Sequence, residues 1–145
     1  MAMGRPRAFD MDQALDQALH VFWEKGYAGT SISDLTEAMG INPPSLYAAF
    51  GNKEKLFEKA LDRYEDLRDQ ILEEAFAAPT AREAVTRLLE GTAERLSDKC
   101  SPRGCLMVQG ALSGGEECEA VKRDLASRRA GVEALPLVKQ IVDVR

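Results

Sequence analysis

Apolar side chains recur at helical spacing through most of the chain, and no segment shows the alternation of a strand. The first such segment covers residues 12–25 and predicts an amphipathic helix. Asp10 is its expected N-cap, and Gly26 stands where a left-handed residue ends a helix. The pattern as a whole predicts an all-α fold. The apolar positions of the first helix are Leu15, Ala18, Leu19 and Phe22.

Two shorter apolar segments follow, and a glycine separates them. The first is expected to begin at a cap formed by Thr30 or Ser31, and Gly40 supplies the turn because a positive φ costs glycine almost nothing. The second opens with Asn42 and two prolines, which a helix tolerates in its first turn. Two short helices joined by a glycine turn are typical of a helix-turn-helix. On spacing alone, a purely structural corner is the favoured interpretation.

The remaining segments also predict helices. Asn42 is the expected N-cap of the helix with the two prolines, and Asn52 is the expected N-cap of a long helix from Lys53 to about Ala77. A capping-box pattern at residues 80–83 opens the next helix. A short apolar helix at residues 105–112 and a charged helix at residues 116–129 follow. The segment from residue 131 to 145 contains a proline and a β-branched run, and it is left unassigned.

Charge does not by itself favour a nucleic-acid partner. The chain has 145 residues and a net charge of −5, and residues 1–55 hold five basic side chains against seven acidic ones. A focused arrangement of a few cations and helix N-termini is still possible. No apolar stretch follows Arg5 and Arg7, so the first residues do not resemble a secretory signal peptide. No apolar run reaches the roughly 20 residues that a membrane span requires. These features predict a cytoplasmic globular protein with no membrane partner.

Several ordered motifs between residues 7 and 65 resemble the N-terminal domain of TetR-family transcriptional regulators. They read FWEKGY, TSISDL, MGI, SLYAAF and NKEKLF. The resemblance implies a dimeric, ligand-responsive regulator, usually a repressor, that releases operator DNA when a small molecule binds. It divides the chain into a helix-turn-helix domain (residues 1–55) and a helical ligand-binding and dimerisation region (residues 56–145). No nucleophile–base pair or metal constellation is visible, so neither an enzyme nor a cofactor is expected.

The resemblance also implies which positions face DNA. A helix over residues 43–50 would enter the major groove, the start of the preceding helix would meet phosphate or the groove rim, and Lys53 would combine a cation with free amides. The expected groove-lining residues are Pro43, Pro44, Ser45 and Ala48; the expected phosphate or rim contacts are Thr30, Ile32, Ser33, Tyr47 and Lys53; and the expected minor-groove arm carries Arg5 and Arg7.

The proposed recognition helix has no charged side chain. It therefore lacks the arginine that commonly contacts guanine, and direct recognition is expected to depend on the Ser45 hydroxyl and on apolar contacts with thymine methyls. DNA shape and half-site spacing would supply further specificity. This uncharged helix and the acidic balance also motivate an alternative function, an effector or protein-interaction module of the same fold that does not bind DNA.

The three cysteines form an odd set whose spacing does not resemble a zinc site. Cys100 and Cys105 flank a short turn, and Arg103 could lower a thiol pKa, which raises the possibility of a thiol sensor. The alternative is that Cys105 is a small core residue. The segment RGCLM at residues 103–107 also resembles the C-terminal domains of one TetR subgroup, so Cys105 could be a packing feature of that subgroup.

The second half of the chain supports fewer predictions. The family usually has another pair of long helices that form the dimer interface, whereas this sequence ends at Arg145. A shortened member, a divergent member and an incomplete chain are all compatible with that ending. An effector pocket is possible, although core packing is the default interpretation of the apolar residues. The pocket candidates are Leu67, Ile71, Phe76, Leu88, Leu89, Leu106 and Met107.

Overall fold

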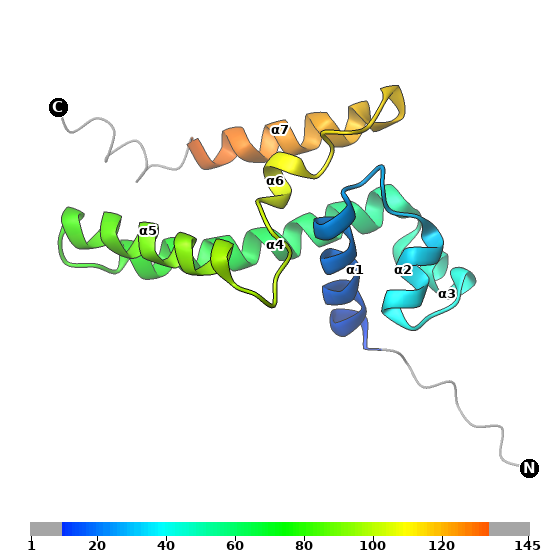
Figure 1. Cartoon of the computed structure of the whole chain (residues 1–145), viewed down its shortest axis with the longest axis horizontal. Helices are drawn as coiled ribbons and strands as arrows, with labels where there is room; N and C mark the ends of the chain where they lie inside the picture. Colours follow the sequence, from blue (N-terminus) through cyan, green and yellow to red (C-terminus); the bar gives the residue numbers. More distant parts are fainter. Residues whose placement is uncertain (1–9, 134–145) are drawn as a thin grey trace, which may run out of the picture.

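The computed structural model describes residues 10–133, and this part of the chain is helical throughout, with no strand. The all-α prediction is confirmed for these residues. The helices of Figure 1 are α1 (Met11–Lys25), α2 (Ile32–Met39), α3 (Pro43–Phe50), α4 (Lys53–Phe76), α5 (Ala81–Ser97), α6 (Leu106–Gln109) and α7 (Glu119–Glu133), and a short 3-10 helix, η1 (Glu116–Cys118), precedes α7.

Side-chain caps begin five of these helices, as the sequence predicts. Asp10 accepts two backbone N–H bonds at the start of α1, and Thr80 caps α5. Of the two cap candidates for α2, Ser31 is the cap. Two boundaries differ from expectation: α6 is only four residues long, and the charged segment begins as a 3-10 helix before α7 continues to Glu133.

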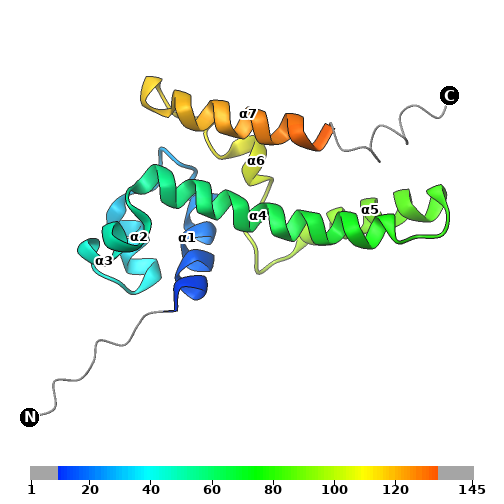
Figure 2. The same cartoon turned by 180° about the vertical axis from the view of Figure 1, so that it is seen from behind.

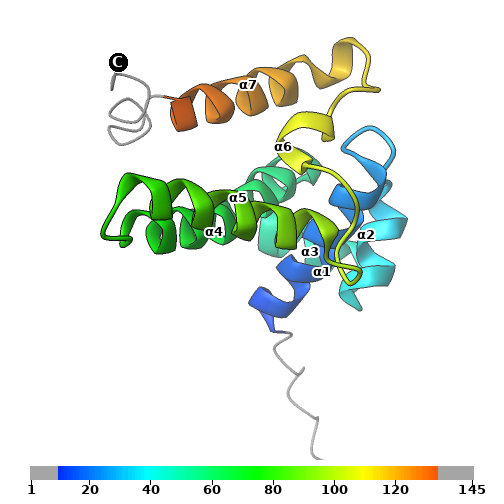
Figure 3. The same ribbon diagram turned by 60° about the vertical axis from the view of Figure 1, so that its left-hand side comes forward.

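The long helix α4 organises the molecule. Helices α1 to α3 pack around its first half, and α5 returns alongside its second half (Figures 1 and 2). Figure 3 shows α6 between the α4–α5 pair and α7, which lies on one side of the molecule. None of the helices within residues 10–133 is both long and apolar enough to cross a membrane.

One continuous core joins the first three helices to the rest. Phe22 of α1 and Phe57 of α4 are almost completely buried and meet edge to face, with ring centroids 4.9 Å apart. Trp23 and Tyr64 form a second edge-to-face pair at 4.9 Å. The same buried cluster includes Leu106 of α6 and apolar residues of α7. Packing is therefore continuous across the expected division at residue 55, which stays a prediction about function.

Helix α5 is less covered than its apolar pattern suggests. The residues at helical spacing on its apolar side are Val85, Leu88, Leu89, Thr92 and Leu96, yet Leu89 is 64% exposed and Val85 and Leu96 are also exposed. Only Ala84 of this helix is fully buried. Periodicity identified the apolar side, but the helix packs chiefly on α4, which covers only part of that side.

Candidate nucleic-acid interface

Helix α3 presents one face to the core and another to solvent. Leu46 and Phe50 are buried, whereas Tyr47 is 47% exposed. Four residues expected to contact DNA are exposed on the outer face, and Ser45 is half-buried beside them. The exposed residues are Pro43, Pro44, Tyr47 and Ala48. The outer face thus offers a phenol, a hydroxyl and small apolar groups, and it carries no charge.

The turn and the cap fix the start of α3. Gly40 ends α2 in a left-handed conformation with φ of 66°, a region that side-chain-bearing residues rarely adopt. The Asn42 side-chain oxygen then accepts a hydrogen bond from the Ser45 backbone N–H at 2.9 Å. This bond occupies the carboxamide oxygen of the only amide side chain in the recognition segment, as the sequence predicts.

A capping box and an ion pair hold the start of α2. The Ser31 hydroxyl accepts from the Asp34 N–H at 3.0 Å, and the Asp34 carboxylate accepts from the Ser31 N–H at 2.9 Å. Lys25 of α1 donates to the same carboxylate at 2.8 Å. The bonds from Lys25 and Ser31 hold the pKa of Asp34 at about 2. Lys25 is therefore engaged within the protein and is not among the expected DNA contacts.

Lys53 occupies the first position of α4, and Asn52 caps that helix by accepting from the Lys55 N–H at 2.8 Å. The Lys53 ammonium lies 4.4 Å from the ring centroid of Tyr27, and partial burial lowers its pKa. No carboxylate within residues 10–133 pairs with it. A cation beside a helix N-terminus is a suitable arrangement for binding phosphate.

The expected DNA-contacting residues at the start of α2 differ in how exposed they are. Ser33 is exposed, whereas Ile32 is half-buried and packs partly against the core. Thr30 is only 2% exposed, and its hydroxyl donates to the Gly26 carbonyl at 2.6 Å. The expectation that the Thr30 side chain faces phosphate is therefore corrected, because its one proton is already used inside the fold. Arg5 and Arg7 lie outside the described residues.

A backbone contact joins the helix-turn-helix to α6. The Tyr27 N–H donates to the Gly110 carbonyl at 2.7 Å, directly after α1 ends at Gly26. A Cβ on Gly26 would lie 3.4 Å from that carbonyl oxygen, and one on Gly110 would lie 3.3 Å from the Phe57 ring. No pattern in the sequence predicts this contact. The only local signal was the presence of a glycine on each side.

Helices α4 to α7 line an open cavity of about 360 Å³. Three of the seven pocket candidates line it, namely Ile71, Leu88 and Met107, whereas Leu106 is part of the core and Leu89 is exposed. The described residues that line it are Tyr64, Arg68, Ile71, Leu72, Leu88, Thr92, Arg95, Leu96, Cys105, Met107, Val108, Arg129 and Val132.

The cysteines are dispersed. Cys105 lines this cavity and accepts a hydrogen bond from the Tyr64 hydroxyl at 3.4 Å, while Cys118 is buried. Cys100 is exposed and lines a different, polar cavity between α1 and the loop before α6. The two thiols of the possible sensor therefore face different cavities, and the sensor stays a prediction.

Comparisons with known proteins agree with this geometry. Residues 14–60 match the family described as "Bacterial regulatory proteins, tetR family". The chain is 38% identical to the HTH-type transcriptional repressor ComR of Escherichia coli (strain K12) over 88% of its own length, and 36% identical to the repressor BdcR of the same strain over 76%. It spans about three fifths of the length of these relatives, 61% of ComR and 56% of BdcR.

A solved structure of a similar protein has the same fold. A cysteine mutant of the TetR family transcriptional regulator CifR, complexed with 26bp double-strand operator DNA, superposes with a TM-score of 0.77 at 50% sequence identity. The match covers 88% of this chain and 67% of the CifR chain. The chain described here therefore belongs to the TetR family of bacterial regulatory proteins.

Proposed function

We propose that this protein is a transcriptional regulator, acting as a repressor, that binds double-stranded operator DNA through α2 and α3. The observation that carries the proposal is the exposed, uncharged outer face of α3, which is followed at the start of α4 by Lys53, a cation with no carboxylate partner within residues 10–133. The relative CifR has been solved with operator DNA, and its similarity extends over both halves of this chain.

Each exposed group has a role in this proposal. The N-terminal half of α3 enters the major groove, where the Ser45 hydroxyl bonds to base edges and Pro44 and Ala48 meet thymine methyls. Tyr47 and Lys53 bind phosphates on either side and set the orientation of the helix without sequence preference. Exposed Ser33 adds a contact at the groove rim, and the arm with Arg5 and Arg7 enters the minor groove.

A small molecule in the cavity between α4 and α7 is the proposed effector. Met107 of α6 lines the cavity, and Gly110 follows three residues later and accepts the Tyr27 N–H bond. The ring of Tyr27 in turn lies beneath Lys53. An effector that favours a displaced α6 would shift Tyr27 and Lys53, and it would lower DNA affinity in proportion to its preference for that state.

A homodimer completes the proposal. Two copies related by a two-fold axis would place their α3 helices in successive major grooves, so the operator would be an inverted repeat with half-sites one helical turn or a multiple of a turn apart.

Selection of bound DNA from a random pool, at two protein concentrations, tests the function directly. We expect enrichment of an inverted repeat at both concentrations, and its half-site spacing would report the dimer. A pool that shows no enrichment would contradict the proposal and favour the alternative, a module of the same fold that does not bind DNA.

A further inference from the structure

The cavity between α4 and α7 is positively charged in a protein that is negative overall. Among residues 10–133, its lining includes three arginines and no carboxylate, although the chain has a net charge of −5. Most of the other lining side chains are aliphatic. An apolar cavity that holds cations without matching anions calls for a ligand with the opposite charge.

The three arginines of the lining are not equivalent. Arg68 pairs with Glu65 at 3.4 Å and Asp69 at 2.7 Å, so its charge is matched within the protein. In contrast, neither Arg95 nor Arg129 has a carboxylate within 4 Å among residues 10–133.

The neighbour of Arg129 shows how this fold neutralises an arginine where no ligand is needed. Arg128 binds Asp62 and Glu65 at 2.7 Å and Asp124 at 2.9 Å. Arg129, one position later on α7, is exposed, and within residues 10–133 it donates only to the Met107 carbonyl, at 2.5 Å. Exposed arginines elsewhere, such as Arg82 and Arg123, also lack a carboxylate partner in this part of the chain, whereas Arg95 is the one half-buried arginine there without such a partner.

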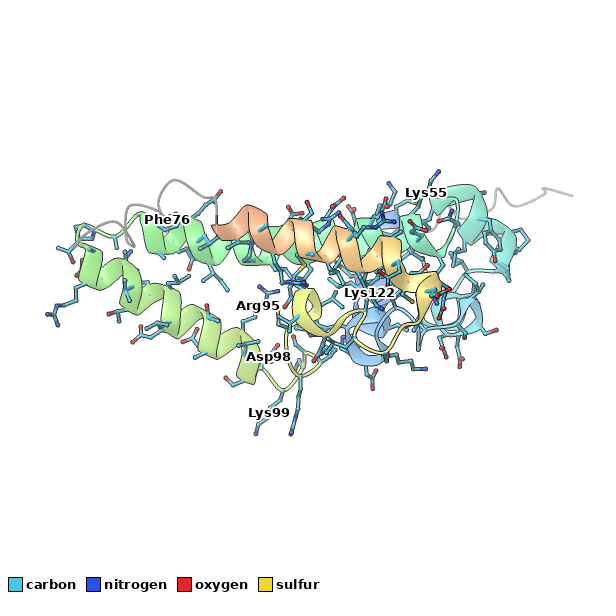
Figure 4. All side chains as sticks on the ribbon, turned by 90° about the horizontal axis from the view of Figure 1, so that it is seen from above. Lys55, Phe76, Arg95, Asp98, Lys99 and Lys122 are labelled. Atoms are coloured by element: carbon cyan, nitrogen blue, oxygen red, sulfur yellow. The ribbon has the colours of Figure 1, made fainter. Side chains whose placement is uncertain are left out.

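Arg95 is held in place while most of its donors are left open. Its guanidinium lies 4.1 Å from the ring centroid of Tyr64 and 5.8 Å from that of Trp23. One of its five N–H donors bonds to the Tyr64 carbonyl, at 3.5 Å. Figure 4 shows Arg95 projecting from α5 toward the interior between the helices. A guanidinium orientated in this way can offer two parallel N–H groups to one planar anion.

We propose that the cavity binds an apolar molecule with a single carboxylate, and that Arg95 is the group that binds this carboxylate. The aliphatic lining takes the body of the molecule, and Arg129 adds to the positive potential. This inference rests on the proposed function, since it assigns a chemical class to the effector, but ligand binding can be measured without DNA.

Matched apolar probes test the proposal on the whole chain. Trp23, the only tryptophan, lies close enough to Arg95 for its fluorescence to report binding. We expect octanoate to bind at least about tenfold more tightly than octan-1-ol, as a charge-assisted pair in a partly apolar site should provide. Arg95→Gln should bring the two affinities together, and Arg95→Lys should restore part of the difference.

Arg82→Gln is the matched control. Arg82 lies on the same helix but outside the cavity lining, and its substitution removes the same positive charge as Arg95→Gln. It should preserve the preference for octanoate. Urea unfolding of each variant shows that the fold is intact, and Arg95→Lys serves as the test if Arg95→Gln does not fold. Equal wild-type affinities, no binding of either probe, or a preference that survives in Arg95→Gln would each overturn the proposal.

The proposed function is tested separately by DNA binding in the absence of probe. Loss of operator binding with the octanoate preference intact would refute the repressor and leave the anion site standing. Normal operator binding without the preference would refute the anion site alone.

Discussion

Lys53 lies half-buried where the candidate interface meets the interior of the protein. It stands at the first turn of α4, where backbone N–H groups are free, and its ammonium lies over the ring of Tyr27. The sequence predicted the first feature from its position after Asn52. The second depends on the path of the chain after α1, which no local pattern specifies.

Replacing Lys53 with alanine should weaken binding to all DNA sequences to a similar extent. Loss of one phosphate contact should also reduce the slope of log affinity against log salt by about 0.9. Fluorescence anisotropy at several salt concentrations measures both effects. Lys59→Ala, which removes an exposed lysine farther along α4, should leave the slope unchanged. A changed sequence preference with an unaltered slope would contradict the phosphate role.

Asp34 makes the stability of α2 depend on pH. Its pKa is about 2 in the folded protein against an ordinary value of 3.8, so its ionised form stabilises the fold. That contribution is fully present above pH 3.8 and is lost as the pH falls toward 2. The stability difference between wild type and Asp34→Asn, measured by urea unfolding, should therefore shrink over this interval. A difference that persists at the acid end would exclude the carboxylate as its source.

At the scale of elements, the beginnings of helices were the most predictable feature. A capping side chain bonds to backbone groups two or three residues away, so the local sequence is enough to predict the cap. The caps Asp10, Asn42, Asn52 and Thr80 all appear as expected. The exposed side of α5 and the short α6 were not predictable, because coverage and length depend on which elements pack there.

The cap of α3 can be tested by substitution. Asn42→Ala should destabilise the protein by about 1 kcal/mol, because the Ser45 N–H loses its partner. Asn42→Ser should recover most of this loss, since serine caps nearly as well. Urea unfolding gives both values. If serine proved as destabilising as alanine, the side-chain cap would not be the cause.

The whole molecule is joined where α1 ends. Gly26 and Gly110 bring two backbone segments into contact, and the Tyr27–Gly110 hydrogen bond crosses from the helix-turn-helix to α6. The same core continues from Phe22 through Phe57 to α6. The helix-turn-helix and the helices that line the cavity are therefore packed together without an intervening linker.

Gly110→Ala should disturb this junction. Its Cβ would meet the Phe57 ring at 3.3 Å and the Leu106 carbonyl oxygen more closely still, so α6 must shift. We expect a loss of about 1–3 kcal/mol in stability and a weaker effect of effector on DNA affinity. Gly131→Ala is the control, because no other group of residues 10–133 lies within 4 Å of the added Cβ and alanine favours helix. Equal stability of the two variants would contradict the close approach.

The sequence by itself determined the helices, their caps, the glycine turn and the family, because each of these depends on residues close together in the chain or on motifs in fixed order. Tertiary structure alone decided three other things: that Thr30 is buried, that Gly110 meets Tyr27, and that Arg95 faces a cavity and has no carboxylate partner within residues 10–133. These contacts join residues brought together by packing, and the spacing of apolar positions shows which face of a helix is buried but not what lies against it.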